Sequence, residues 1–421
     1  MTEQGQAGGT IEISHPASPA RPAAVAFIFL TILLDMLALG LIVPILPKLV
    51  ESFVDNDTAR AARIFGLFGT AWALMQFVFS PILGSLSDRF GRRPVVLLSN
   101  FGLGLDYILM ALAPSLVWLF VGRVISGITS ASMSTAFAYI ADTTPPERRA
   151  AVFGKVGAAF GAGFVLGPAI GGLLGGLDPR LPFWAAAALS LANALYGLLI
   201  LPESLSHDRR SPFRWKSANP IGAMHLLRSD RVLAGLSVVN FIAQLAHVVL
   251  PSTFVLYATY RYGWDTATVG VTLATVGICA MVVQGAGIGP IVARLGERGA
   301  LMLGLACGAA GFLIFGVASS GLLFWLGIPV MSLWGVSGAA LQALNTRLVR
   351  PDQQGRLQGA TNSVQSVSQL LGPFLFTLTF AYFIGANAPL TLPGAPFLLA
   401  GALLLVALVI AVRTLSILQI R

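Results

Sequence analysis

Charged residues are scarce in this chain of 421 residues. Lys, Arg, Asp and Glu make up 10% of it, whereas 56% is hydrophobic. Soluble domains carry about 25% charged residues, so the composition excludes a soluble enzyme and a disordered protein. The chain has two cysteines, Cys279 and Cys307, both in apolar runs, which excludes a disulfide scaffold. We find no nucleotide-binding loop, catalytic Ser/His/Asp set or metal-ligand cluster, and therefore expect no enzyme activity, metal or cofactor.

Long apolar segments are what the sequence has instead. A helix needs about 20 apolar residues to cross a bilayer, and twelve such segments follow Arg21. Because they are long and do not alternate as barrel strands do, they are predicted to be transmembrane helices of an all-α integral membrane protein. Their approximate ranges are 23–46, 63–84, 94–113, 116–140, 150–175, 182–201, 232–257, 267–291, 300–319, 321–343, 358–384 and 395–412.

Basic residues are divided unequally between the two sets of loops. One set holds 20 Lys and Arg residues and the other holds five. Since cytoplasmic loops carry the excess, both termini and the long loop after the sixth segment are predicted to lie in the cytoplasm. The net charge of +9 is therefore a topology signal of a multi-pass protein of the cell (inner or plasma) membrane, with the lipid bilayer and not a nucleic acid as partner.

Short matches recur at an offset of 205 residues. Pro146 corresponds to Pro351, Gly154 to Gly359, and Gly167-Pro168 to Gly372-Pro373. These matches predict two parallel repeats of six helices related by an axis along the membrane normal. We assign 1–21 to a flexible tail, 22–201 to the first bundle, 202–230 to a cytoplasmic linker and 231–421 to the second bundle. Two fused halves also suggest a monomer.

Several motifs resemble those of the major facilitator superfamily. The loop Gly84–Pro94 is similar to the signature loop of that superfamily. Leu34–Gly40, Gly122–Gly127 and Gly163–Gly172 resemble motifs of its drug–proton antiporter branch. The tetracycline efflux family is the nearest match, on Leu105–Tyr107, Ala138–Asp142, Leu201–Ser204, Ala293–Glu297 and Gly355–Gly359 as well as on the signature loop.

The signature loop has a mechanical interpretation. Gly84 would allow close helix approach, and Asp88 and the arginines would bond a neighbouring helix end and cross the seam between the halves. The alternative is that these cations only set topology. The latch residues are predicted to be Gly84, Asp88, Arg89, Gly91, Arg92, Arg93, Asp142, Glu147 and Arg148.

A second motif places small residues four apart in the fifth segment, which lets helix backbones meet closely. Gly-Pro steps in the fifth and eleventh segments can also bend a helix. Such a bend would lie at the interface between the halves and limit leak, and the resemblance implies that it marks an antiporter. The motif comprises Gly163, Gly167, Pro168, Gly171, Gly172, Gly372 and Pro373.

Three charged residues lie deep inside the predicted spans: Asp35, Asp106 and Arg123. A carboxylate at the centre of a span costs about 2.5–3.5 kcal/mol to insert. One interpretation is a buried ion pair with Arg123 that holds helices together. The other, which we favour, is a proton-binding site in a water-filled cavity, with Arg123 as the counter-charge. The spacing leaves open which carboxylate exchanges the proton.

The second half has no acid deep in a span, but it has several amide side chains. These amides have two possible roles. They form hydrogen bonds between helices, or they bind a substrate with carbonyl and hydroxyl groups. His247 could titrate near neutrality, although packing is the more common role of such a residue. With two residues of the first half, the candidate substrate-binding residues are Gln76, Tyr107, Asn240, Gln244, His247, Gln284, Gln342, Asn345, Asn362 and Gln365.

At two positions the sequence differs from the tetracycline exporters. The resemblance implies a histidine in the eighth span and an aspartate in the ninth, where this chain has Ala280 and Gly308. If transport is coupled to protons, the first half must therefore provide the coupling residues.

Taken together, the sequence predicts a secondary transporter that exports small amphipathic organic compounds in exchange for protons by alternating access. The alternative is uptake or facilitated transport of a metabolite by the same fold, with different or no proton coupling. A sensor or enzyme is disfavoured because no soluble domain is attached.

Overall fold

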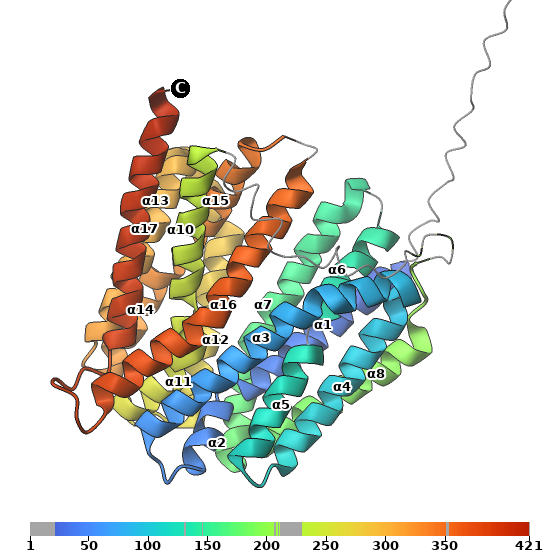
Figure 1. Cartoon of the computed structure of the whole chain (residues 1–421), viewed down its shortest axis with the longest axis horizontal. Helices are drawn as coiled ribbons and strands as arrows, with labels where there is room; N and C mark the ends of the chain where they lie inside the picture. The colour runs from blue at the N-terminus through green and yellow to red at the C-terminus, as the bar shows by residue number, and fades with distance from the viewer. Residues whose placement is uncertain are drawn as a thin grey trace, which may run out of the picture.

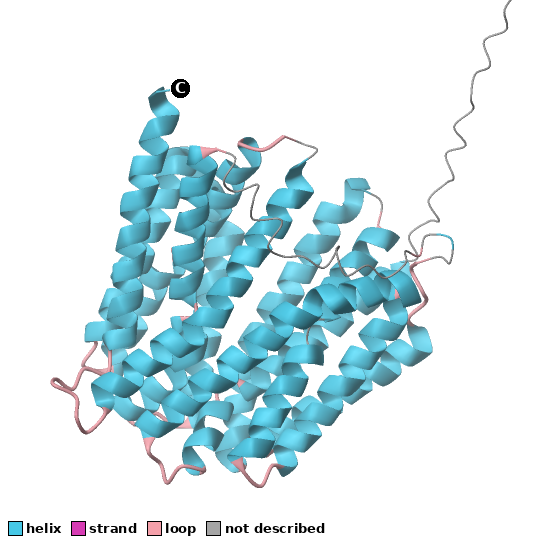
Figure 2. Cartoon of the chain, in the orientation of Figure 1, coloured by secondary structure: helices cyan, strands magenta, loops and turns pink. Residues whose placement is uncertain are grey.

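The structure, a computed structural model, describes residues 22–129, 132–144, 146–205, 208, 210, 230–350 and 353–420. The predicted tail and most of the predicted linker lie outside this range. Helices account for all the regular structure among the described residues, and Figure 2 shows no strand there.

The first half of the sequence forms helices whose order follows the predicted segments. They are α1 (Pro22–Ile42), α2 (Leu46–Ser52), α3 (Thr58–Phe90), α4 (Arg92–Leu112), α5 (Leu116–Thr129), α6 (Ser132–Thr143), α7 (Pro146–Leu177) and α8 (Leu181–Ile200).

The second half continues in the same way. Its helices are α10 (Arg231–His247), α11 (Val249–Tyr262), α12 (Thr266–Val282), the π-helical turn η4 (Val283–Gly287), α13 (Ile288–Val317), α14 (Gly321–Ser332), α15 (Gly335–Arg347), α16 (Gln354–Ile384) and α17 (Ala395–Ile420).

The described helices include ten stretches that are long and apolar enough to cross a membrane. One of them, Thr266–Val317, has 52 residues and is kinked at Gly296, whose φ of 66° is not helical. A further apolar helix, Leu116–Thr129, is shorter. The chain is thus an all-helical membrane protein with ten to twelve long apolar helices.

The first, seventh and tenth predicted spans are each divided into two helices by a short turn, and the eighth continues from α12 into α13 through the π-helical turn η4. Proline explains two of these divisions, because it has no N–H to continue the helical bonding. Pro44 follows the end of α1, and Pro251 cannot bond to the carbonyl of His247, where α10 ends. Leu333 and Trp334 separate α14 from α15. In the fourth span, α5 ends at Thr129 and α6 begins at Ser132.

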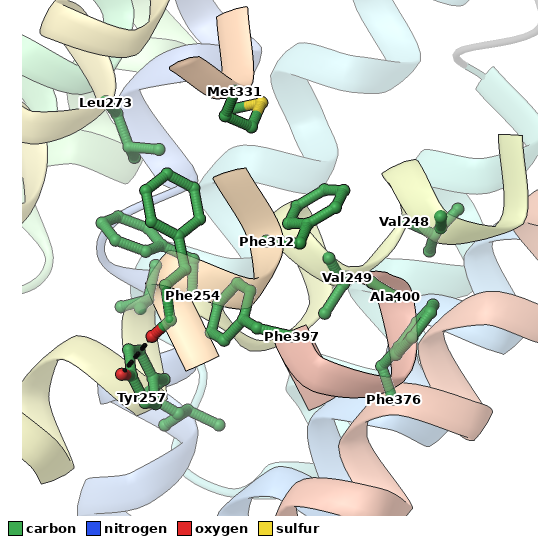
Figure 3. Close-up of a cluster of buried hydrophobic side chains, with 14 of the residues drawn as sticks. Val248, Val249, Phe254, Tyr257, Leu273, Phe312, Met331, Phe376, Phe397 and Ala400 are labelled. Carbon is green, nitrogen blue, oxygen red and sulfur yellow. Dashed lines mark hydrogen bonds between the residues drawn. The ribbon is translucent and has the colours of Figure 1, made fainter. Parts of the chain in front are cut away.

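Aromatic side chains fill the core between the C-terminal helices (Figure 3). Phe315 and Phe324 stack with ring centroids 4.1 Å apart, and Phe397 meets the ring of Tyr257 at 4.8 Å. The hydroxyl of Tyr257 donates to the carbonyl of Phe315 at 2.8 Å, so the polar end of this buried ring is satisfied.

The N-terminal and C-terminal helices meet mainly at two helix pairs: α3 packs against α16, and α7 packs against α12 (Figure 1). Glycine permits both contacts. A Cβ on Gly270 would collide with the carbonyl of Pro168, and one on Gly69 would lie 2.9 Å from the Cβ of Pro373. Gly172 also lies against Gly270, so Pro168, Gly172 and Pro373 are at these two contacts.

The other glycines of the α7 motif face a different neighbour. A Cβ on Gly163 would lie 2.5 Å from the Cβ of Met36, one on Gly167 would lie 2.6 Å from the Cα of Gly40, and Gly171 presses on the backbone of Leu41. These three glycines therefore pack α7 against α1 of the same half. Gly372 likewise packs against Val248 of its own half. Helix α7 thus has one small-residue face for α1 and another for α12.

At one end of the bundle a hydrogen bond also links the two parts of the chain. The ammonium of Lys48, in α2, donates to the carbonyl of Trp264 at 3.0 Å, just before α12. The next residue, Asp265, caps α12, and its Oδ1 accepts from the N–H of Thr268 at 2.8 Å. Hydrogen bonding from Thr268 holds the pKa of Asp265 below its usual range.

The packing of α7 on α1 gives a first prediction. Gly167→Ala forces a methyl group onto backbone, which cannot move aside as a side chain can, and we expect a loss of about 1–3 kcal/mol in stability. The measurement is the apparent Tm of the purified protein in detergent. Gly157→Ala, in the same helix but with no described atom within 4 Å of its Cβ position, is the control. Equal Tm values for the two variants would contradict this packing.

Candidate functional site

Asp35 lies in the middle of α1, and a neighbouring helix holds its carboxyl group. The side-chain Nδ2 of Asn193, in α8, donates to Asp35 Oδ1 at 3.0 Å and to the backbone carbonyl of Thr31 at 3.2 Å. Asn193 is fully buried, and Asp35 is half-buried. The carboxyl group of α1 is therefore fixed by a polar contact inside the helix bundle.

The other two intramembrane charges, Asp106 and Arg123, share a neighbour with Asp35, which is Tyr107. Tyr107, buried in α4, interacts electrostatically with Asp35, Asp106 and Arg123. Asp106 is 1% exposed and lies against α5, where a Cβ on Gly122 would be 3.0 Å from its Oδ1. The structure thus brings the three predicted proton-coupling residues and Tyr107 into one polar region of the N-terminal helices.

Arg123 does not form a direct ion pair in this region. Its guanidinium lies 5.3 Å from the ring centroid of Trp72, in α3, a cation–π contact. Among the described residues, no ion pair within 4.0 Å joins Arg123 to Asp35 or Asp106. The structure therefore lacks the tight ion pair that would make these charges a simple link between helices.

Some of the predicted amides of the second half form a row of hydrogen bonds. Gln342 Nε2, in α15, donates to Gln358 Oε1 at 3.2 Å, and Gln358 Nε2 donates to Asn362 Oδ1 at 3.2 Å, both in α16. All three side chains are exposed in the absence of lipid and ligand. Gln358 was missed by the sequence prediction, although it lies in the motif Gly355–Gly359 and one helical turn before Asn362.

His247 and Gln284 lie where helices of the second half are irregular. The ring of His247, at the end of α10, is 5.5 Å from that of Trp334, between α14 and α15. Gln284 lies in the π-helical turn η4, and its Cγ is 3.7 Å from the position of a Cβ on Gly335. Both predicted residues therefore lie beside Trp334 and Gly335, and Trp334 itself was missed.

Trp334 also explains the glycine in the ninth span. A Cβ on Gly308 would be 2.7 Å from Cγ of Trp334 and 2.9 Å from a methyl group of Leu404. The space for a side chain at position 308 is thus filled by the indole ring. Ala280, the other difference from the efflux family, is half-buried in α12.

The remaining predicted substrate residues are not brought into these contacts. Gln76, Asn240 and Gln244 are half-buried and Gln365 is exposed, whereas Asn345 is 3% exposed. Among the described residues no set of three or more His, Cys, Asp or Glu side chains could hold a metal ion.

The predicted latch forms a dense polar cluster around Arg92. Its Nε donates to Asp142 Oδ2 at 3.1 Å, and its guanidinium also pairs with Asp88 and donates to Ser87 Oγ. Arg93 donates to the carbonyl of Leu198, near the end of α8, at 2.7 Å. Arg89 lies over the ring of Phe90. The side chains of Glu147 and Arg148 lie outside the described part of the chain.

Two details of the latch differ from the prediction. The described contacts of Arg92 and Arg93 stay within the first half and do not cross the seam. Gly84 makes no close helix contact, since a Cβ there would meet no described atom within 4 Å. Close approach occurs at Gly91 instead, where a Cβ would collide with Glu203 and φ is +107°, which glycine tolerates.

Glu203 contacts the latch residues Arg92 and Arg93 but was missed by the prediction. Its Oε1 accepts from the N–H of Arg92 at 2.8 Å, and its Oε2 accepts from the N–H of Arg93 at 3.3 Å. It thus caps α4 from the loop after α8, where its negative charge also suits the helix N-terminus. The resemblance at Leu201–Ser204 was the signal that pointed to it.

The second half repeats the Arg92–Asp142 bridge with its charges reversed. Glu297 and Arg347 are 205 residues after Arg92 and Asp142, and Arg347 lies 2.7 Å from Glu297 Oε1. A cavity of about 520 Å³ lies beside this pair and is lined by Val292, Leu295, Gly296, Glu297, Arg298, Leu344, Arg347 and Leu348.

Many apolar helices, broken spans and buried intramembrane charges define the chain as a multi-pass membrane protein of transporter type. The sequence profile of the Major Facilitator Superfamily matches residues 28–373. The chain belongs to that family.

The relatives agree with this assignment. The chain is 39% identical over 381 residues to the class C tetracycline resistance protein of Escherichia coli, covering 90% of this chain and 93% of that protein. It is 38% identical to the class G tetracycline resistance protein of Vibrio anguillarum, covering 84% and 89%. In fold it resembles the nucleoside transporter NupG, with a TM-score of 0.75, 12% identity and coverage of 93% and 99%.

The cap on α4 gives a second prediction. Glu203→Ala leaves two helix N–H groups without their acceptor, which costs about 0.5–2 kcal/mol. We expect amide hydrogen exchange at residues 92–93 to become about 2-fold to 30-fold faster, by the Boltzmann factor of that cost. Glu203→Gln keeps a carbonyl acceptor and should show a smaller change. Unchanged exchange in Glu203→Ala would rule out the cap.

Proposed function

We propose that this chain exports small amphipathic organic compounds in exchange for protons by alternating access. The observation that carries the proposal is the polar region around Asp35. A carboxyl group in the middle of a span costs about 2.5–3.5 kcal/mol unless it is used. Here it is held by Asn193, with Tyr107, Asp106 and Arg123 close by.

Proton exchange requires a carboxyl group whose surroundings can change. Arg123 contacts Trp72 and is not locked to either carboxylate, so its distance from Asp106 can change when α3 and α5 move. Because Coulomb energy varies inversely with distance, such a movement would alter how strongly the acid holds its proton. We therefore assign proton coupling to Asp35, Asp106 and Arg123.

The same proposal includes the organisation and orientation of the halves. Residues 22–201 and 231–421 would act as two bundles joined by residues 202–230, in a chain of twelve spans with both termini in the cytoplasm. The contacts α3–α16 and α7–α12 would be the surfaces about which the bundles rock. The cluster around Arg92 would then lie on the cytoplasmic side and the Lys48–Trp264 bond on the opposite side.

For the substrate, the second half supplies hydrogen-bonding side chains without a buried acid. The row Gln342–Gln358–Asn362 and the group His247, Gln284 and Trp334 combine amide and aromatic surfaces. Such a lining suits a ligand with rings, carbonyls and hydroxyls. Tetracycline, the drug named for the relatives above, is therefore the first compound to test.

One observation favours the alternative of metabolite transport. Ala280 and Gly308 stand where the efflux family is expected to have a histidine and an aspartate, and Trp334 fills the space at position 308. A thermal-shift screen of the purified protein against drugs and metabolites, on both sides of neutral pH, would separate the two substrate classes.

The decisive test is substrate-driven proton movement in proteoliposomes that contain a pH-sensitive dye. The wild type should release protons when tetracycline or another compound identified in the screen is added. Asp35→Asn, which cannot bind and release a proton, should reduce this signal to that of protein-free liposomes. Asp55→Asn is the matched control, because Asp55 is an exposed loop residue with a positive φ that Asn tolerates.

If Asp35→Asn exchanges as the wild type does at every pH, Asp35 is not the coupling residue. Accumulation of substrate inside cells, together with an unchanged drug-resistance profile, would instead support the uptake alternative.

A further prediction concerns the end at which α2 meets the turn before α12. Lys48→Met removes the donor to Trp264. If this bond contributes about 1 kcal/mol, the ratio of molecules in which α2 contacts the turn before α12 to those in which it does not should fall about fivefold. Distances between spin labels at Asp55→Cys and Ala267→Cys, with Cys279 and Cys307 replaced by serine, would measure that population. Arg60→Met, at an exposed position of α3, should leave the distances unchanged.

A further inference from the structure

Asn193 is a buried amide that the assignments above leave without a role of its own. It lies in α8, is fully buried, and uses its Nδ2 group to contact one turn of α1 twice. One hydrogen bond ends on the Thr31 carbonyl and the other on Asp35 Oδ1, four residues later. This contact joins the backbone and the acid of α1 to a single side chain.

The orientation of this amide is set by its partners. The Thr31 carbonyl can only accept a hydrogen bond, and an ionised carboxylate can also only accept. An amide turned the other way would place its oxygen against both acceptors. The donor group must therefore face α1, and its bond to Asp35 is stronger when Asp35 is ionised, because a charged oxygen is the better acceptor.

Packing alone does not explain an asparagine at this position. Its Oδ1 is buried without a hydrogen-bond partner among the described residues, which is unfavourable in an apolar interior. An alanine would avoid that cost. The two donated bonds are what distinguishes Asn193 from an apolar residue here.

We propose that Asn193 is a positioning residue that orients the Asp35 carboxyl group and favours its ionised form through a direct hydrogen bond. The proposal rests on the assignment of Asp35 as the coupling acid. A donor to a carboxyl oxygen stabilises the ionised more than the neutral form. Asn193 therefore sets the pH at which Asp35 gains its proton, without exchanging a proton itself.

Few other described titratable side chains lie on the helices that pack against α1. The helices packed against α1 are α6, α7 and α8. Their described titratable side chains are Tyr139, whose hydroxyl bonds to the Pro202 carbonyl, Asp142 in the latch, the exposed Lys155, and Tyr196. The side chains of Glu147, Arg148 and Arg149, at the start of α7, lie outside the described residues.

A second group of charges acts on Asp35 from further away. Tyr107 and Asp106 in α4 and Arg123 in α5 reach it as the electrostatic neighbours already described. None of them has a hydrogen bond to Asp35 of the kind that Asn193 makes among the described contacts.

The experiment is infrared difference spectroscopy of the purified protein between acid and neutral pH, which reports the C=O stretch of protonated carboxyl groups. The band that disappears in Asp35→Asn identifies Asp35. In Asn193→Ala, we expect this band to change frequency. We also expect its pH midpoint to rise by about one unit, because the ionised carboxylate loses one charge-assisted hydrogen bond.

Ser190→Ala is the matched control, since Ser190 is also buried in α8, three residues earlier, and its hydroxyl has no partner among the described residues. Its band should match the wild type in frequency and midpoint. Asn193→Ser, which keeps one donor, should lie between the wild type and Asn193→Ala. If Asn193→Ala does not fold, this partial variant still tests the proposal.

The possible results separate the two assignments. An Asp35 band that Asn193→Ala leaves unchanged overturns the positioning role, even if Asp35→Asn abolishes exchange. A band that moves in Asn193→Ala supports it. If Asp35→Asn removes no band, both the positioning role and the proton site at Asp35 are wrong.

Discussion

An ionisable side chain inside a membrane span must be held by other polar groups, and the N-terminal helices are arranged around this requirement. Asp35 lies within a span, where bulk water does not surround it, and an amide from α8 donates a hydrogen bond to its carboxyl group. Asp106 is enclosed between α4 and α5, and Arg123 rests on the face of an indole ring. Polar groups from α1, α4, α5 and α8 therefore surround these charges, and the helix packing must keep them in place. The close approach of Gly167 to Gly40 serves that purpose, because it fixes α1 against α7 one turn and a half from Asp35.

The C-terminal helices meet a different requirement. They contain no acid deep in a described span, and their interior is a cluster of aromatic rings that includes Phe254, Phe312 and Phe397 (Figure 3). Their polar groups lie instead beside interrupted helices. His247 is at the end of α10, Trp334 is between α14 and α15, and Gln284 is in a π-helical turn. Interruptions of this kind free backbone groups and turn side chains toward one another. The N-terminal helices thus surround charged groups, whereas the C-terminal helices present aromatic and amide groups.

The sequence was sufficient to predict the helices, because twelve long apolar segments have no other stable form in lipid. Each of them corresponds to helical structure, and the family membership is confirmed. The helix divisions were missed because apolar composition continues through Val248 and Leu333, where only backbone geometry changes. Contacts between distant residues were also out of reach. Nothing in the spacing indicates that Asn193 meets Asp35 or that Trp334 fills the space at Gly308. The roles assigned to the candidate residues stay predictions.

The bridge that recurs with opposite polarity 205 residues later has a consequence for exchanging parts of the chain. Arg92 with Asp142, and Glu297 with Arg347, each contribute one cation and one anion, so the local sum of charge is zero in either arrangement. A single exchange would have left two like charges facing each other, and only the compensating exchange restores attraction. A chimaera that joins one partner from each copy would bring either two positive or two negative groups together.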